Sequence, residues 1–513
     1  MLQSRLQIAQ VPRAAPPSRL HQLTLELRHR PLVVVSNREP YVHEHGDGGI
    51  VVQRPPGGLV TGLEPLLRAC GGTWIAHGSG SADFDIAGPD GLVAVPPEDP
   101  RYRLRRLFLT PEEVERYYGG FANEALWPLC HLAYAQPRFR DADWQAYRTV
   151  NARFARAAAT HAAKGLVFVQ DYHLALVPAA IREAVPSAEI AHFWHIPWPN
   201  VEVASICPWM GELVTGLLGA DVLGFHTRQH CHNFVETARA LVPGCRISAA
   251  GDAIELRGHR TIVRPYPISI EWPYPAASDG DGAALRAELG IAPDVHVSIA
   301  VDRCDYTKGL VERLAAIELM LEEHRELRGR FTLVQIAAPS RMQLDRYRDL
   351  GRELADGVER LNARFATESW RPVILRLESV APEDVRRHYA MADSALVTPL
   401  HDGMNLVAKE YAASCRGDRG VLVLSRFAGA AEEMEGALLV NPHHPSDVAA
   451  AIVRTVVMPP MERAARIRTL RAAVERNTIY DWAANLLGDL AALRTTAQPR
   501  VIDEVLTIRT AHA

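Results

Sequence analysis

Several features that would assign this chain to a common class are missing from its sequence. No apolar run approaches the roughly 20 residues that a membrane-spanning helix needs, so we expect no contact with a membrane. The opening residues MLQSRLQIAQVPRAAPPSRL lack the continuous apolar core and the small-residue cleavage site of a signal peptide. Neither sign of charge is in excess, because 56 Lys and Arg stand against 60 Asp and Glu. That balance argues against a general nucleic-acid-binding protein.

Cysteine is scarce, and its spacing is irregular. The seven cysteines are scattered along the chain and include no C-x-x-C pair. An odd number at irregular spacing is typical of reduced thiols rather than of a disulfide framework. We therefore expect a cytoplasmic protein.

The sequence does contain a repeated strand–loop–helix pattern. Short apolar runs rich in β-branched residues end in a Gly, Asp or His turn, and a helical pattern follows each of them. These runs are PLVVVSNR, GLVFVQDYH, IAHFWHIP, ADVLGFHT, VHVSIAVDR, FTLVQIAAPSR, SALVTPLHDG and GVLVLSRFAG. Continuous apolar strands that alternate with helices predict parallel sheets covered on both faces, and therefore an α/β fold.

The length of the chain predicts two large domains, since 513 residues exceed what one hydrophobic core organises. A stretch rich in Pro, Gly and Asp (265–283) separates two sets of strand–helix units. We expect an N-terminal domain (31–270) and a C-terminal domain (271–477) with a cleft between them, followed by a helix and tail (478–513). The preceding extension (1–30) could pack on the body or on a partner subunit, so a homo-oligomer is one interpretation.

The segment ALVTPLHDGMNLVAKEYAAS carries the most informative polar residues. Backbone N–H groups and the positive end of a helix that starts near Leu406 suit a diphosphate. Gly403 permits close approach of the backbone. Asp402 is placed to bind sugar hydroxyls, and Glu410, four residues into the helix, to bind a ribose diol. The alternative is a plain strand–turn–helix connection in which Asp or Asn only caps the helix.

Three cations follow strands in the same half of the chain. Arg303 and Lys308 lie five residues apart after VHVSIAV, and Arg341 follows FTLVQIAAPS. An Arg fork and a Lys point charge both suit a diphosphate, although any single pair of this kind can be a solvated loop. No D-x-D motif follows a strand in this half, and the DADW of 141–144 lies in a helical stretch. We therefore expect the cations to neutralise a leaving diphosphate without a metal ion or other cofactor.

The N-terminal half has its own polar residues after strands. Arg38 follows the first strand, and Gly58 opens a helix in PPGGLVTGL. Asp171 and His195 follow two further strands. The competing interpretations are an N-cap for Asp171 and a turn-bracing role for the histidine.

One further pattern suggests a metal. His226 and His230 in GFHTRQHCHNF are four residues apart, which would place two imidazoles on one helix face. No Glu follows His226 directly, so the H-E-x-x-H pattern of zinc proteins is absent, and we favour no metal.

In order along the chain, many segments resemble those of the trehalose-6-phosphate synthase family of glycosyltransferases. They are VSNR, PGGLVTGL, YYGGFANEALWPLCH, QDYHLALVP, FWHIPWP, LLGADVLGFHT, YPISIE, VDRCDYTKGL, QIAAPSR, TPLHDGMNLVAKEY and LVLSRFAGAAEEM. The resemblance runs from about residue 31 to about 490. It implies a GT-B fold with two facing Rossmann-like domains, and a retaining glucosyltransferase that uses UDP- or GDP-glucose and glucose 6-phosphate.

The resemblance also implies roles for single residues. The acceptor contacts are Arg38, Tyr118, Trp127, Asp171 and Arg341. The donor contacts are Gly58, His195, Arg303, Lys308, Val380, Asp402, Gly403, Met404, Asn405, Leu406, Val407 and Glu410. Those expected to act in catalysis are Asp171, His195, Arg303, Lys308 and Asp402, while the leaving diphosphate takes the proton of the acceptor.

The departures from the family lie near the acceptor. The loop 39–56 is long, and His77 stands where the family usually has a second Trp. Gln170 and His401 replace a usual His and a usual Arg. Two other hypotheses therefore stay open: another phosphorylated acceptor, such as glycerol 3-phosphate, and a non-catalytic homologue that binds sugar phosphates.

Overall fold

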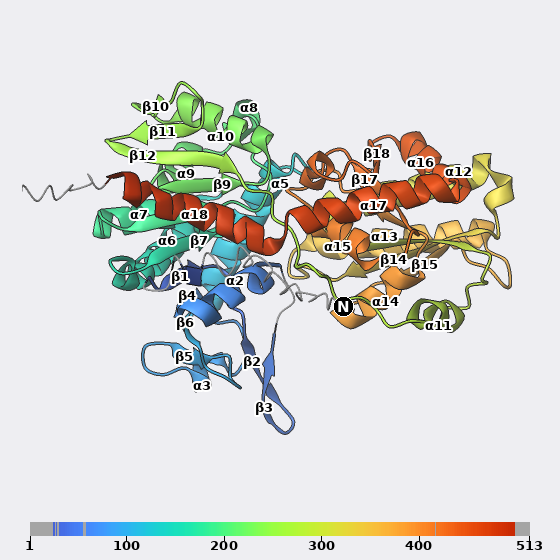
Figure 1. Cartoon of the computed structure of the whole chain (residues 1–513), viewed down its shortest axis with the longest axis horizontal. Coiled ribbons are helices and arrows are strands. Elements are labelled where there is room, and N and C mark those ends of the chain that lie inside the picture. Colours follow the sequence, from blue (N-terminus) through green and yellow to red (C-terminus); the bar gives the residue numbers. More distant parts are fainter. Residues whose placement is uncertain (1–23, 26, 28–29, 55–57, 416, 498–513) are drawn as a thin grey trace, which may run out of the picture.

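The computed structural model describes residues 24, 25, 27, 30–54, 58–415 and 417–497, which form two lobes side by side (Figure 1). Most of the expected N-terminal extension and of the C-terminal tail lies outside these residues. No helix of the described part is long and apolar enough to cross a membrane.

The first lobe contains a ten-stranded sheet. In spatial order its strands are β10 (Arg246–Ile247), β11 (Ala253–Leu256), β12 (His259–Pro265), β9 (Val222–Phe225), β8 (Glu189–Phe193), β7 (Leu166–Gln170), β1 (Leu32–Val35), β4 (Gly72–His77), β6 (Tyr102–Leu107) and β5 (Leu92–Val95). The strands from β12 to β6 are parallel, and the pairs at both edges are antiparallel. Gly72 is required where β4 begins, because its φ of +139° is left-handed and an added Cβ would clash with the Leu32 carbonyl.

Helices surround this sheet, and a separate hairpin projects from the lobe (Figure 1). The helical segments are α2 (Gly58–Cys70), α3 (Asp83–Ile86), α4 (Pro111–Glu113), η1 (Val114–Leu126), α5 (Trp127–Cys130), α6 (Asp141–Ala162), η2 (Tyr172–Leu174), α7 (Val177–Ala184), α8 (Val201–Ala204), α9 (Met210–Leu217) and α10 (Arg228–Leu241). The hairpin consists of β2 (Val42–Gly46) and β3 (Gly49–Gln53). It occupies most of the long loop 39–56.

The second lobe contains a six-stranded sheet, and every strand pair in it is parallel. In spatial order its strands are β15 (Val373–Arg376), β14 (Phe331–Ala338), β13 (His296–Arg303), β16 (Ser394–Val397), β17 (Val421–Ser425) and β18 (Leu438–Val440). The helical segments are α11 (Asp281–Glu288), η3 (Tyr306–Lys308), α12 (Leu310–Glu323), η4 (Arg325–Leu327), α13 (Asp345–Phe365), α14 (Pro382–Met391), α15 (Leu406–Ser414), η5 (Gly429–Glu432), α16 (Pro445–Val457) and α17 (Pro460–Arg476).

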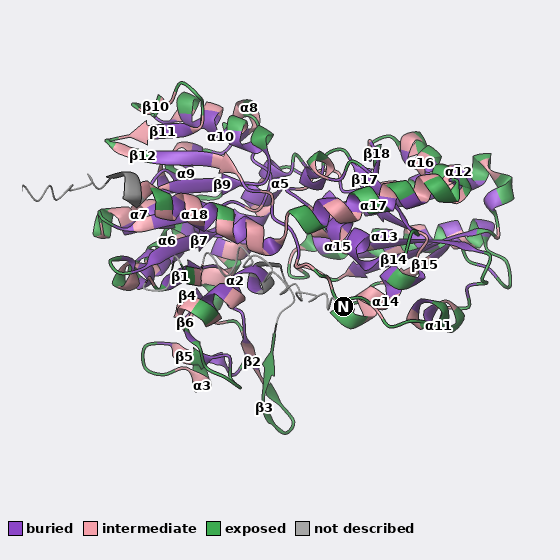
Figure 2. Cartoon of the chain, in the orientation of Figure 1, coloured by how far each residue is buried: buried purple, intermediate pink, exposed green. Residues whose placement is uncertain are grey.

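The strand predictions are confirmed, because each of the eight apolar runs contains a strand of one of the two sheets. These eight strands are mostly buried, while the outer faces of the helices are exposed (Figure 2). Burial in α13 follows helical spacing and falls on Tyr347, Leu350, Gly351, Leu354, Val358, Leu361 and Phe365. Hydrophobic periodicity therefore accounts for the layers of both lobes.

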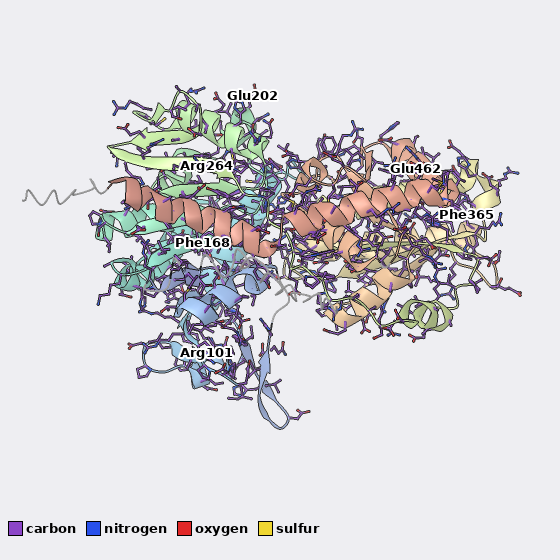
Figure 3. All side chains as sticks on the ribbon, in the orientation of Figure 1. Arg101, Phe168, Glu202, Arg264, Phe365 and Glu462 are labelled. Atoms are coloured by element: carbon purple, nitrogen blue, oxygen red, sulfur yellow. The ribbon has the colours of Figure 1, made fainter. Side chains whose placement is uncertain are left out.

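The last helix, α18 (Ile479–Ala497), returns to the first lobe. The Trp482 ring of α18 lies 5.7 Å from the ring of Phe168 in β7, and Asp489 accepts a 2.8 Å hydrogen bond from Arg264 in β12. Figure 3 labels Phe168 and Arg264 beside this helix. The chain thus crosses between the lobes twice, in residues 266–280 and again at 477–478.

Candidate active site

A cavity of about 640 Å³ is lined by residues of both lobes. Its walls come from the carboxyl ends of β1, β7 and β8 in one lobe, and of β13 and β14 with the start of α15 in the other. This is the edge at which open parallel sheets bind ligands.

Most of the predicted site residues line this cavity. Those that do are Arg38, Tyr118, Trp127, Asp171, His195, Arg303, Lys308, Arg341, Asp402, Met404, Asn405, Leu406, Val407 and Glu410. Val380 and Gly403 are not among the described residues of the lining. Val380 lies half-buried between β15 and α14 and packs on the hydrophobic core, and Gly58 is the first residue of α2.

A buried carboxylate, Asp305, organises the cations of the second lobe. Its Oδ2 accepts a 3.0 Å hydrogen bond from Arg341 Nη1 and lies 3.9 Å from Arg303 Nη2. Trp127 of the first lobe donates from Nε1 to Asp305 Oδ1 at 3.4 Å. The guanidinium carbons of Arg341 and Arg303 lie 4.0 and 5.3 Å from the centre of the Trp127 ring. This cluster therefore joins the two lobes.

The charge of Asp305 is held by these cations. Burial alone would raise its pKa, but Arg341, Arg303 and Lys308 outweigh burial and lower the pKa to about 2. Arg341 is itself buried, and its Nε has no hydrogen-bond partner among the described residues. An unpaired buried donor beside a cavity is costly unless a ligand binds it.

Lys308 and Asp402 form a largely buried ion pair at the start of α15. Lys308 Nζ donates to Asp402 Oδ2 at 2.5 Å, and Asn405 Nδ2 donates to the same oxygen at 3.1 Å. Burial would raise the pKa of Asp402, but Lys308 lowers it below its ordinary value. The helix begins directly after Asn405, whose φ of +71° is left-handed. The predicted helix start is confirmed, and it brings the positive end of α15 beside a lysine.

Two arginines from opposite lobes converge on Tyr118. Burial would raise the pKa of the Tyr118 hydroxyl, but Arg341 and Arg38 lower it below its ordinary value. The Tyr118 ring stacks on the ring of His173 at 5.5 Å. The geometry therefore offers one anion two guanidinium groups.

Asp171 and His195 lie side by side at the ends of β7 and β8. Asp171 has a φ of +74° and caps η2, because its Oδ1 accepts from the backbone N–H of Tyr172 at 2.9 Å. The same oxygen accepts from the backbone N–H of His195 at 3.2 Å. Burial would raise the pKa of Asp171, but His173, His195 and these backbone donors hold it well below its usual range. Asp171 is therefore both the N-cap and a lining carboxylate, so the two interpretations are compatible.

Glu410 lies deeper on α15. Its Oε2 accepts a 3.1 Å hydrogen bond from the Tyr389 hydroxyl, and burial raises its pKa. Asp302 also lines the cavity, and its Oδ2 accepts from Arg313 Nη1 at 2.9 Å. Each lining carboxylate of the second lobe thus has a hydrogen-bond donor.

Sequence reasoning assigned no substrate-binding role to several residues of the site. They are Asn37, His131, Gln170, Tyr172, His173 and His226, which line the cavity, and Asp305, which orients its cations. A signal was present for Asp305, which stands between the two cations that were found. The others either end a strand or lie close to a residue already assigned.

One expectation about the histidines needs correction. His226 precedes α10, which begins at Arg228, so His226 and His230 do not share a helix face. His226 Nε2 instead donates to the His195 carbonyl at 3.0 Å, and the described residues hold no cluster of three or more His, Cys, Asp or Glu suited to a metal ion. His77, which stands where the family usually has a second Trp, bonds through Nδ1 to the Leu107 carbonyl at 3.2 Å and is not among the described lining residues.

The chain matches the model of glycosyltransferase family 20 over residues 30–492. It is 40% identical over 495 residues to a trehalose-6-phosphate synthase of Mycolicibacterium smegmatis, a match that covers 92% of this chain and 94% of that one.

Solved structures agree with the sequence match. An alpha,alpha-trehalose-phosphate synthase (UDP-forming) from Burkholderia xenovorans, in complex with glucose-6-phosphate, has a TM-score of 0.78 and 32% identity over 90% of this chain and 99% of that one. A structure from E. coli bound with UDP-2-fluoro glucose has a TM-score of 0.80 and 32% identity over the same shares of the two chains. The chain therefore belongs to glycosyltransferase family 20, the family of the trehalose-6-phosphate synthases, and is a glycosyltransferase with the GT-B fold.

Proposed function

We propose that this enzyme transfers glucose from UDP-glucose to glucose 6-phosphate with retention of configuration and so forms trehalose 6-phosphate. The observation that carries the proposal is a single cavity lined by two sets of cations, each of which can bind an anion. One consists of Arg303, Lys308 and the start of α15, and the other of Arg38 and Arg341. A nucleotide sugar and a sugar phosphate each need one of these sites.

The first anion site suits the diphosphate of the donor. Negative charge grows on this group as the glycosidic bond breaks, and preorganised donors stabilise it without reorganisation. Lys308 is held by Asp402, and Arg303 lies over Trp127, so both cations are placed before substrate binds. Glu410 is then the residue for the ribose diol.

The second anion site suits the phosphate of the acceptor. Arg38 and Arg341 come from different lobes, and a phosphate bound by both would hold the lobes together. Closure of the cleft would exclude water and align the acceptor hydroxyl with the anomeric carbon. The solved relative from B. xenovorans that was crystallised with glucose-6-phosphate supports this choice of acceptor.

The lining carboxylates favour a front-face mechanism over a covalent intermediate. Asp171 already accepts two backbone hydrogen bonds, and Asp402 is paired with Lys308. We therefore infer that no carboxylate attacks the sugar. The bond between the anomeric carbon and the diphosphate oxygen breaks, the bond to the acceptor oxygen forms on the same face, and the acceptor proton passes to the departing diphosphate.

A panel of donors and acceptors tests this function. UDP-, GDP- and ADP-glucose are each combined with glucose 6-phosphate, glycerol 3-phosphate and free glucose. We expect the highest kcat/KM with UDP-glucose and glucose 6-phosphate. A preference for glycerol 3-phosphate would assign the enzyme to glucosylglycerol-phosphate synthesis, and no turnover with any pair would favour a non-catalytic homologue.

Activity is expected to survive removal of divalent metals. Cations and backbone N–H groups are proposed to neutralise the diphosphate, so neither magnesium nor manganese is needed. Initial rates are measured after dialysis against EDTA and again after metal is restored. Complete loss that magnesium or manganese reverses would contradict this assignment.

Gly403→Ala is expected to weaken donor binding. An added Cβ would lie 2.5 Å from the His195 carbonyl oxygen, so the loop before α15 would have to move. Overpacking costs about 1–3 kcal/mol, which corresponds to a rise of about 5- to 150-fold in the KM for UDP-glucose. Gly48→Ala is the matched control, because nothing lies within 4 Å of the Cβ it would add. Equal KM values in the two variants would show that this loop does not position the donor.

A further inference from the structure

Three polar groups of His195 are held by the protein. The backbone N–H donates to Asp171 Oδ1 at 3.2 Å, and the carbonyl accepts from His226 Nε2 at 3.0 Å. On the side chain, Nε2 lies 2.9 Å from Gln170 Oε1. The ring packs edge-on against Phe193 with 4.6 Å between centroids. His195 is therefore fixed in position and orientation before substrate binds.

The remaining polar atom of His195 is Nδ1. The described residues provide no hydrogen-bond partner for it, whereas the residue lines the cavity. Among the described residues, an atom without a hydrogen-bond partner is either buried and unsatisfied or accessible. Nδ1 is not one of the buried, unsatisfied atoms, so it is accessible from the cavity. A hydroxyl group of a substrate is the partner that such an atom would take.

Whether Nδ1 carries the ring proton or a free lone pair depends on Gln170. Burial lowers the pKa of His195, so at neutral pH the ring is uncharged and holds one proton. When Gln170 Oε1 faces the ring, that proton lies on Nε2 and Nδ1 presents a lone pair. Gln170 is 1% exposed and ends β7, where the parallel register places it opposite Phe193 of β8, two residues before His195. The sheet therefore fixes the backbone of Gln170, and the contact with His195 is the hydrogen bond of its Oε1, while its Nε2 has no partner among the described residues.

We propose that Gln170 is a positioning residue that fixes the orientation and the Nε2–H tautomer of His195, so that Nδ1 accepts a hydrogen bond from a hydroxyl of the donor glucose. This role rests on the proposed function. Histidine, the usual family residue at this position, can itself change protonation state, whereas the carboxamide of glutamine does not titrate. Glutamine at this position therefore adds no titration of its own beside His195.

Two variants of Gln170 separate hydrogen bonding from packing. Gln170→Met keeps the side-chain length but cannot hold the ring, and it is expected to lower kcat/KM for UDP-glucose about tenfold, the effect of one lost hydrogen bond. The KM for glucose 6-phosphate should stay within about twofold, since its phosphate is proposed to bind Arg38 and Arg341, and Tm serves as the check on folding.

Gln170→Glu keeps an oxygen on Nε2 and adds a charge. The titratable groups near His195 are otherwise Asp171, His173, His192 and His226. The new carboxylate should raise the pKa of His195 and produce a loss of activity on the acid side that the wild-type enzyme does not show. A pH–rate profile identical to that of the wild type would contradict the contact between the two side chains.

A double-mutant cycle decides whether Gln170 acts through His195. In a His195→Ala background, Gln170→Met is expected to have no further effect on the affinity for UDP-glucose, measured by titration without acceptor. An undiminished tenfold effect in that background would overturn the proposal. Wild-type enzyme that fails to join UDP-glucose to glucose 6-phosphate would contradict the proposed function, whereas active wild type matched by Gln170→Met would contradict only the positioning role.

Discussion

Replacing Lys308 by alanine is expected to lower kcat at least a hundredfold. Loss of one preorganised donor to a developing oxyanion costs about two to three orders of magnitude in turnover. Lys308 also neutralises Asp402, to which it donates at 2.5 Å, so the variant would leave a buried carboxylate facing the leaving diphosphate. Arg303→Ala should show a loss of similar size. Steady-state rates at saturating UDP-glucose and glucose 6-phosphate measure both effects.

Lys164→Ala is the matched control for the loss of a lysine, because Lys164 is exposed and lies outside the cavity lining. Its kcat should equal that of the wild type. Near-normal turnover in Lys308→Ala, with Tm unchanged, would remove the assignment of this residue to the diphosphate.

Arg38→Ala is expected to raise the KM for glucose 6-phosphate by one to two orders of magnitude. A hydrogen bond to a charged group contributes about 1.5–3 kcal/mol, and Arg38 is one of the two arginines proposed to bind the phosphate. The KM for UDP-glucose should change little, because the donor cations come from the other lobe. The ratio of kcat/KM for glucose 6-phosphate to kcat/KM for free glucose should fall by the same factor.

Arg101→Ala provides the comparison for this variant. Arg101 is exposed on the first lobe (Figure 3) and pairs with Asp99. The Arg101→Ala variant should leave the KM values for glucose 6-phosphate and for UDP-glucose unchanged. If Arg38→Ala raised the KM for UDP-glucose instead, the assignment of the two anion sites to donor and acceptor would have to be reversed.

The sequence predicted the parts of the site that depend on chain order. In a parallel sheet the residue after each strand falls at one edge, so Arg38, Asp171 and Arg341 were recognisable without coordinates. The start of α15 was recognisable for the same reason, since a strand, a Gly-containing turn and a helix follow one another. These are local patterns with a fixed geometrical consequence.

The contacts between residues far apart in sequence could not be predicted in this way. Asp305 is separated from Trp127 by 178 positions, and only the packing of the two lobes brings them together. Helical spacing suggested a metal site at His226, but the helix begins two residues later. Tertiary contacts of this kind have no periodic signal in the sequence.

The most direct test of the account is the product formed from UDP-glucose and glucose 6-phosphate. NMR of the isolated product reports the anomeric configuration at both linked carbons and the position of the phosphate. We predict a non-reducing disaccharide with an intact 6-phosphate and an α configuration at the transferred glucose, because the acceptor hydroxyl attacks from the face that the diphosphate leaves. A β linkage at the transferred glucose, or release of free glucose in its place, would contradict the account.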